Sequence, residues 1–160
     1  MEELATYLRE RIPAPQSVTL VHNDYKLDNM MVERDDPAKP VAVFDWDMCT
    51  LGDPLVDLGT LLGYWTEAGD DEARTAFRTM PTHLPGFFSR AQLTEHYARR
   101  SGRDMSDIRW YEVFALFKTA VVIQQIFVRW HRGQTRDERF RDYGARVKGL
   151  IEAARTALNR

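Results

Sequence analysis

Apolar residues in the first third of the chain come in short runs separated by turn-forming residues, a pattern typical of short strands and loops. The runs lie at residues 18–21, 30–32 and 41–44. The segment 34–40 between the second and third runs carries two prolines and two aspartates. Such turn-rich composition favours a tight reversal, so the second and third strands are predicted to form an antiparallel hairpin.

From Asp53 onward apolar residues recur every three or four positions, which is the period of amphipathic helices. Asp53 and Pro54 are typical of a helix start, and Ser89 and Gln92 have the spacing of a capping box. The predicted helices cover residues 3–11, 53–69, 89–100 and 107–131, and a last one whose buried face runs from Phe140 to Leu158. Residues 74–86 contain two prolines and stay unassigned.

These elements predict one mostly helical α+β domain over residues 1–160, with a small antiparallel sheet at one edge. A chain of 160 residues is long enough to bury a core, and 44% hydrophobic with 29% charged residues is an ordinary globular composition. The predicted division places a loop-and-strand segment at 18–57 and a helical subdomain at 58–160.

Charge is unevenly spread although the net charge is only −2. Residues 21–72 hold thirteen acids and three bases, which suits cation handling, whereas residues 129–160 hold nine bases and four acids. Because the late bases are interspersed at helical spacing, a solvated helix face is expected rather than a nucleic-acid surface. The apolar segment 110–130 contains Glu112, Lys118, Gln124, Gln125 and Arg129 and is interpreted as a buried helix, so no membrane contact is expected.

The cysteine content indicates whether the protein works in a reducing or an oxidising compartment. A single cysteine, Cys49, excludes an internal disulfide and fits a reducing environment. No N-terminal stretch has the basic-then-apolar order of a signal peptide. A cytoplasmic protein is expected.

The most informative segment is His22-Asn23-Asp24-Tyr25-Lys26-Leu27-Asp28-Asn29, followed by Phe44-Asp45-Trp46. It places an aspartate, an asparagine five residues later, and a second aspartate after an apolar run. Phosphoryl transfer from a nucleotide needs a carboxylate for the acceptor hydroxyl and hard oxygen ligands for magnesium. Antiparallel pairing of the hairpin would bring Asn29 and Asp45 together, as two ligands of one ion require.

This arrangement resembles the catalytic loop and metal-binding segment of the protein-kinase-like superfamily. More closely it resembles the aminoglycoside phosphotransferase family, which includes choline kinases, homoserine kinases and the kinase-like portions found beside acyl-CoA dehydrogenases. The resemblance continues through residues 51–59. The sequences of residues 25–29 and 50–54 resemble the acyl-CoA-dehydrogenase-associated branch more than true antibiotic kinases. It implies the fold of a kinase C-terminal lobe.

The resemblance also implies roles for individual residues. Asp24 would orient the acceptor hydroxyl and take its proton. Asn29 and Asp45 would hold Mg²⁺ against the phosphates of ATP. Lys26 would approach the transferred phosphoryl group and offset its charge, with a solvent-facing loop lysine as the alternative.

Two further residues would brace the loop. His22 would do so by hydrogen bonding and packing and not act as the base, and Asp57 would anchor the loop from the following helix. Asn23 stands where the family more often has glycine, and asparagine tolerates unusual backbone angles, so this departure is mild.

Kinase-like enzymes carry an N-terminal lobe with a phosphate-covering loop and a strand lysine. About twenty residues precede the motif here, they contain no glycine, and no strand lysine of that kind is found. The chain is therefore expected to be a fragment, a truncated gene product or half of a split enzyme. A separate N-terminal lobe or a second copy of the chain would be its partner.

The predicted function is ATP-dependent, Mg²⁺-assisted phosphorylation of a small-molecule hydroxyl. One alternative is a non-catalytic binding or assembly module derived from a kinase C-lobe. Another is a haloacid-dehalogenase-like phosphatase, since Asp45-Trp46-Asp47 resembles its nucleophile loop, although that fold needs later parallel strands. Aminoglycosides, choline-like alcohols, sugars and hydroxyacyl thioesters all remain open as acceptors.

Overall fold

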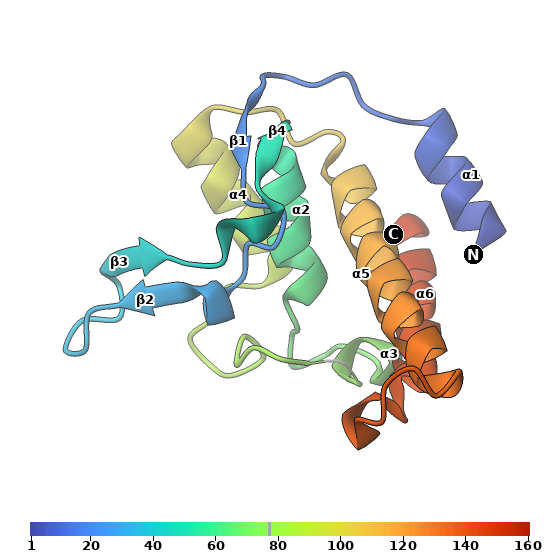
Figure 1. Ribbon diagram of the computed structural model, residues 1–160. Helices are drawn as coiled ribbons and strands as arrows, with labels where there is room; N and C mark the ends of the chain where they lie inside the picture. The colour runs from blue at the N-terminus through green and yellow to red at the C-terminus, as the bar shows by residue number, and fades with distance from the viewer. Residues whose placement is uncertain (77) are drawn as a thin grey trace.

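The computed structural model describes residues 1–76 and 78–160, and it divides into a helical body and a smaller part made of strands and loops (Figure 1). The helices are α1 (Glu2–Glu10), α2 (Leu55–Tyr64), α3 (Glu72–Thr75), α4 (Arg90–Ser101), α5 (Ile108–His131) and α6 (Tyr143–Leu158). The strands are β1 (Thr19–Val21), β2 (Met30–Val32), β3 (Pro40–Val43) and β4 (Thr50–Gly52). Short 3₁₀ turns are η1 (Leu27–Asn29), η2 (Trp46–Met48) and η3 (Glu138–Phe140). The predicted mostly helical α+β class is confirmed.

Two separate antiparallel pairs of strands carry the loops of interest. The predicted hairpin is present: β2 pairs with β3, with Met30 opposite Val43, and it projects from the rest of the molecule (Figure 1). The second pair joins β1 to β4, with Leu20 opposite Leu51, and β4 was not predicted. Because β4 pairs with β1 in the antiparallel direction, the residues just before β4 lie beside the loop that follows β1. Both strand pairs of the described residues are antiparallel, so the later parallel strands that the phosphatase alternative needs are not found among them.

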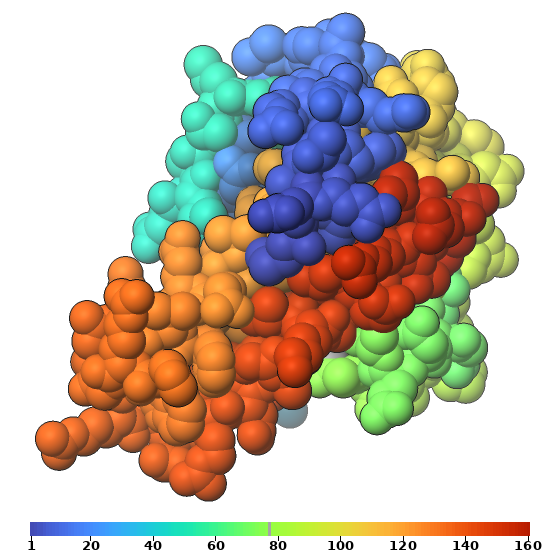
Figure 2. Space-filling view, turned by 90° about the vertical axis from the view of Figure 1, so that its right-hand side faces the viewer, coloured from blue at the N-terminus to red at the C-terminus, as the bar shows by residue number. Residues whose placement is uncertain are grey.

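The helical body is built around α5, which packs against α2 on one side and α6 on the other. Leu116 of α5 and Leu150 of α6 are each 1% exposed and belong to the same core cluster. Helix α1 lies over α5 and α6, as Figure 2 shows, and adds Leu4 to this core. The indole Nε1 of Trp110 donates to the Leu8 carbonyl at 3.1 Å, which ties α1 in place.

Two glycines allow α2 to approach α5 closely. A Cβ at Gly59 would lie 2.6 Å from the backbone of Tyr111, and a Cβ at Gly63 would lie 3.2 Å from the Cβ of Ala115. Any larger residue at Gly59 would therefore push the two helices apart. This close packing brings side chains of α5 within reach of the loop on the other side of α2.

The end of α2 is a correction to the sequence prediction. The helix was expected to continue to Gly69 but ends at Tyr64, and Trp65 has extended backbone angles. The buried guanidinium of Arg74 donates to the Leu62 carbonyl at 2.5 Å, and that of Arg90 donates to the Trp65 carbonyl at 2.9 Å. These side chains cap the carbonyl groups at the end of the helix, and the Thr66 N–H donates to the Thr82 hydroxyl at 3.0 Å instead of to the Leu62 carbonyl.

Other helix predictions are confirmed to within a few residues. The Ser89 capping box opens α4, and Gly102 ends it in the left-handed conformation. In the unassigned region 74–86, the described residues belong to no helix or strand apart from the last two residues of α3. Residue 77 lies outside the described residues. Helix α5 is long and apolar enough to cross a membrane by length and composition, with a mean hydropathy of 1.4, and its N-terminal half is packed against α2 and α6.

Candidate active site

His22 sits at the end of β1, where the chain leaves the sheet and enters the candidate loop. Its ring is 1% exposed and lies 4.7 Å from the indole ring of Trp46. The backbone N–H of Asp24 donates to Nδ1 at 3.2 Å, so Nε2 carries the proton and donates to the Phe44 carbonyl at 2.6 Å. Both ring nitrogens are therefore used to join the loop to the segment after β3. This is the geometry that a bracing role requires, and it leaves no nitrogen to act as a base.

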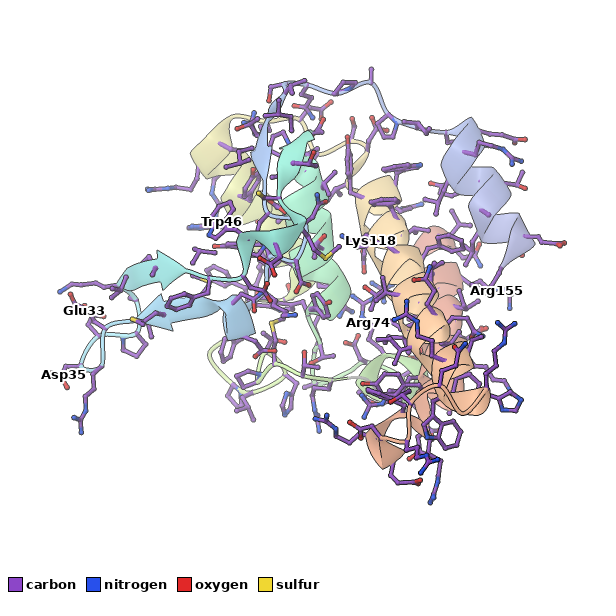
Figure 3. All side chains as sticks on the ribbon, viewed as in Figure 1. Glu33, Asp35, Trp46, Arg74, Lys118 and Arg155 are labelled. Carbon is purple, nitrogen blue, oxygen red and sulfur yellow. The ribbon has the colours of Figure 1, made fainter. Side chains whose placement is uncertain are left out.

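The next residue, Asn23, holds the loop in an unusual backbone conformation. Its φ is 65°, in the left-handed region that asparagine tolerates better than most residues. The Asp57 carboxylate accepts hydrogen bonds from the backbone N–H groups of His22 at 2.7 Å and Asn23 at 2.8 Å. From α5, the Lys118 ammonium donates to the Asn23 carbonyl at 2.6 Å (Figure 3). Two helices thus fix the same turn of the loop.

Lys118 is unusual because its charged group is largely withdrawn from water. Burial lowers the pKa of Lys118, while the nearby carboxylates of Asp24 and Asp57 act in the opposite direction. The ammonium group is thereby held between the helical body and two acids of the loop region.

Asp24 is the meeting point of three side chains. The Lys26 ammonium donates to Oδ2 at 2.6 Å, and the Asn29 amide Nδ2 lies 3.3 Å from the same oxygen and 2.9 Å from the Asp24 carbonyl. The Tyr64 hydroxyl donates to Oδ1 at 3.0 Å. The structure therefore brings together Asp24, Lys26 and Asn29, all of which were predicted from the sequence, and adds Tyr64, which was not.

The hairpin brings the backbone of Asn29 beside Phe44, the residue that precedes Asp45. The Phe44 N–H donates to the Asn29 carbonyl at 2.8 Å, so Asp45 follows the direct partner of Asn29. Asp45 is exposed and has a φ of 61°, and Asn29 is only 8% exposed. None of the hydrogen bonds within the described part of the chain uses the Asn29 Oδ1 oxygen.

These two oxygen donors fit Mg²⁺ in the way proteins usually hold it, with few protein ligands and the remaining positions left to phosphate and water. The described residues contain no group of three or more His, Cys, Asp or Glu side chains that could hold a metal ion. A metal at this position would therefore depend on a bound nucleotide for much of its coordination.

A cavity of about 300 Å³ opens beside Asp24. Lys26, Lys118 and Arg146 contribute cationic groups to it, and Val122 contributes apolar surface. The other lining residues are Asn23, Asp24, Met48, Tyr64, Thr79, Thr119, Ile123, Tyr143 and Leu150. The walls therefore come mainly from α5 and α6, while the loop of residues 22–29 supplies one side.

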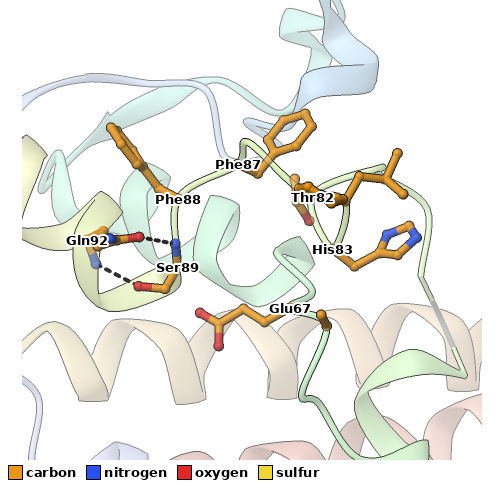
Figure 4. A pocket seen from close by; sticks show the side chains of 10 residues that line it. Glu67, Thr82, His83, Phe87, Phe88, Ser89 and Gln92 are labelled. Carbon is orange, nitrogen blue, oxygen red and sulfur yellow. Dashed lines mark hydrogen bonds between the residues drawn. The ribbon is translucent and has the colours of Figure 1, made fainter.

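A second cavity, of about 370 Å³, lies on the far side of α2 near the start of α4 (Figure 4). Its lining includes Glu67, His83, Phe87 and Phe88 but none of the predicted site residues. Of these two cavities, the one beside Asp24 contains the predicted site residues Asp24 and Lys26.

The sequence contained a signal for only one of the two additional residues. Tyr64 follows Asp57 by seven positions, two helical turns, so both side chains lie on the same face of α2. Lys118 lies 95 residues from its Asn23 partner in the chain, so no spacing between neighbouring residues predicts this hydrogen bond.

Comparison with known proteins agrees with this geometry. Residues 1–96 match the model of the "Phosphotransferase enzyme family". A solved structure described as a putative aminoglycoside phosphotransferase from Ralstonia eutropha JMP134 superposes with a TM-score of 0.78 at 28% identity, covering 98% of this chain and 47% of that one.

Curated relatives include "Probable acyl-CoA dehydrogenase IBR3" of Arabidopsis thaliana, 29% identical over 96% of this chain and 20% of its own length. "Acyl-CoA dehydrogenase family member 11" of Mus musculus is 32% identical over 86% of this chain and 18% of its own length. The chain thus spans about a fifth of these relatives. The resemblance to aminoglycoside phosphotransferases and to the acyl-CoA-dehydrogenase-associated branch is confirmed, and the chain belongs to the phosphotransferase enzyme family.

Proposed function

We propose that this protein transfers the terminal phosphoryl group of ATP to the hydroxyl of a small molecule, with Mg²⁺ as cofactor. The observation that carries the proposal is the Asp24 carboxylate, which lines the 300 Å³ cavity while contacting both Lys26 and Asn29. A phosphotransferase needs one carboxylate at the junction of the acceptor, the transferred group and the metal.

In this proposal Asp24 orients the acceptor hydroxyl in the cavity and accepts its proton as the oxygen attacks phosphorus. Lys26 moves from Asp24 toward the transferred group and offsets its negative charge. Asn29 Oδ1 and the Asp45 carboxylate would hold Mg²⁺, which when bound neutralises charge on the nucleotide phosphates.

The nucleotide would lie on the strand side of the site. Apolar side chains of β1, β3 and β4 are open to solvent there, including Leu20 at 56%, Val41 at 57% and Leu51 at 72% exposure. Such a surface is suited to cover by another lobe, supplied by a separate chain or a second copy. The same surface favours the alternative function, a module that binds a partner without catalysis.

The charge of the cavity favours neutral or anionic acceptors. Lys26, Lys118 and Arg146 line it, and Asp24 is its one carboxylate, already paired with Lys26. An aminoglycoside carries several ammonium groups and would meet repulsion from these cations. Sugars, hydroxy acids and hydroxyacyl thioesters are accordingly proposed ahead of aminoglycosides and choline-like alcohols.

The test is transfer of the terminal phosphate of labelled ATP to a panel of these acceptors, with and without Mg²⁺. Wild-type protein would be compared with Asp24→Asn, in the presence of the whole polypeptide or a supplied N-terminal lobe. Loss of the base should reduce turnover by at least about 10²-fold.

Asp47→Asn is the matched control, because Asp47 is exposed close to the same site. Equal turnover of the wild type and Asp24→Asn across the panel would refute the enzymatic proposal. Binding of a partner that is indifferent to Asp24→Asn would then favour the module.

A further inference from the structure

Helix α2 presents two side chains to the catalytic loop, one from its first turn and one from its last residue. Asp57 accepts from the backbone N–H groups of His22 and Asn23, as described above. Tyr64 donates its hydroxyl to Asp24 Oδ1 at 3.0 Å. Seven residues correspond to about 700° of helical rotation, within about 20° of two full turns, so the two side chains share one face.

We infer that Tyr64 is a positioning residue for Asp24, an inference that rests on the proposed function. Asp24 Oδ2 is contacted by Lys26 and Asn29, whereas Oδ1 is contacted by Tyr64. Lys26 and Asn29 are assigned to the phosphoryl group and the metal, so both are drawn toward the nucleotide during turnover. Tyr64 has no such second role. Its hydroxyl keeps Oδ1 fixed and leaves Oδ2 for the acceptor.

The ionisation of Tyr64 supports a role as permanent donor. Burial, with the negative charge of Asp24 and the hydrogen bond to it, raises the pKa of Tyr64 far above its ordinary value. The phenol therefore keeps its proton throughout the range in which the enzyme would work. Its ring also lies under Lys26, whose ammonium is 5.1 Å from the ring centroid.

The backbone of Tyr64 is itself held in place. The residues on either side of it, Gly63 and Trp65, are buried, and the Trp65 carbonyl accepts from Arg90 at 2.9 Å. The Trp65 indole donates to the Phe88 carbonyl at 2.8 Å. A donor on such a fixed backbone can hold its carboxylate to a fraction of an ångström, which is what a positioned base requires.

The experiment is Tyr64→Phe, which removes the hydroxyl and keeps the ring beneath Lys26. In the Mg²⁺–ATP transfer assay, kcat should fall roughly 10-fold, because a base displaced by about 1 Å loses much of its effect. The KM for ATP and the thermal unfolding midpoint should stay at their wild-type values. Tyr97→Phe is the matched control, since Tyr97 lies on α4 outside this cavity and its hydroxyl makes no hydrogen bond among the described residues.

Combining Tyr64→Phe with Asp24→Asn separates positioning from general structural support. If Tyr64 acts through Asp24, the double variant should turn over at the rate of Asp24→Asn alone. A loss that multiplies in the double variant, an equal loss in Tyr97→Phe, or a kcat within about twofold of wild type would overturn the inference. Absence of any Asp24-dependent transfer would instead refute the proposed function, and this inference with it.

Discussion

The helical body and the strand-and-loop part of this protein are stabilised in different ways. In the helical body, Leu116 and Leu150 are each 1% exposed and lie in one continuous core. In the strand part, Leu20 and Leu51 are 56% and 72% exposed. The loop of residues 22–29 is instead held by polar contacts from the helices, through Asp57, Tyr64 and Lys118. The site therefore owes its geometry to hydrogen bonds from a rigid neighbour and not to a core of its own.

The largest effect on the helical body is expected from Asp70→Asn. Asp70 forms an ion pair with Arg90, and their side chains are only 5% and 8% exposed. Removing the Asp70 charge leaves the buried guanidinium of Arg90 with its more distant carboxylates, Glu67 at 3.2 Å and Glu112 at 4.0 Å. The free energy of unfolding should therefore fall by about 3–5 kcal/mol at pH 7. Urea unfolding of the two proteins measures the difference.

The pH dependence sharpens this prediction. Burial of the Asp70 carboxyl opposes its ionisation, but hydrogen bonds from Arg90 and a backbone N–H outweigh burial and lower its pKa below the usual 3.8. A lowered native pKa contributes stability above the unfolded value, and that stability is lost as pH falls through the native value. The difference between wild type and Asp70→Asn should therefore shrink as pH falls below 3.8 and through the lowered native pKa. A constant difference would mean that the charge is not responsible.

A matched pair of leucine substitutions compares the two regions directly. Leu116→Ala should lower the free energy of unfolding by about 2–5 kcal/mol, because it opens a cavity in the core. Leu51→Ala removes the same atoms from an exposed site and should change it by less than about 0.5 kcal/mol. Urea unfolding again provides the values. Similar losses at the two positions would show that the strand surface is covered in solution.

A smaller loss of stability than at Leu116, but a more local one, is expected from Asp57→Ala. It leaves the N–H groups of His22 and Asn23 without their carboxylate, which should cost about 2 kcal/mol. Amide hydrogen exchange should accelerate at His22 and Asn23 and remain unchanged in the core of α5. Asp47→Ala, at an exposed position, serves as the control. Unchanged exchange at both amides would contradict the anchoring of the loop by α2.

Sequence reasoning succeeded where the determinants are local. The hairpin follows from two apolar runs around a turn-rich segment, and the start of α4 follows from the Ser89 and Gln92 capping box. The predicted loop residues come together because Asp24, Lys26 and Asn29 lie within six positions of one another.

Sequence reasoning failed where the structure depends on contacts between distant parts of the chain. Strand β4 has only three residues and exists through pairing with β1, about 30 positions earlier. The end of α2 depends on Arg74 and Arg90, whose guanidinium groups take its last carbonyls. Lys118 meets Asn23 only because Gly59 lets α5 approach α2. None of these contacts leaves a periodic signal in the sequence.

The two faces of α2 have a consequence for insertions and deletions. Asp57 and Tyr64 face the loop, while Gly59 and Gly63 lie about 100° or more away around the helix, against α5. Adding one residue between Asp57 and Tyr64 would rotate everything beyond it by about 100° and shift it by about 1.5 Å. The loop contact and the helix contact would then be lost together. Related proteins should therefore keep the length of this stretch, together with small residues at the positions of Gly59 and Gly63.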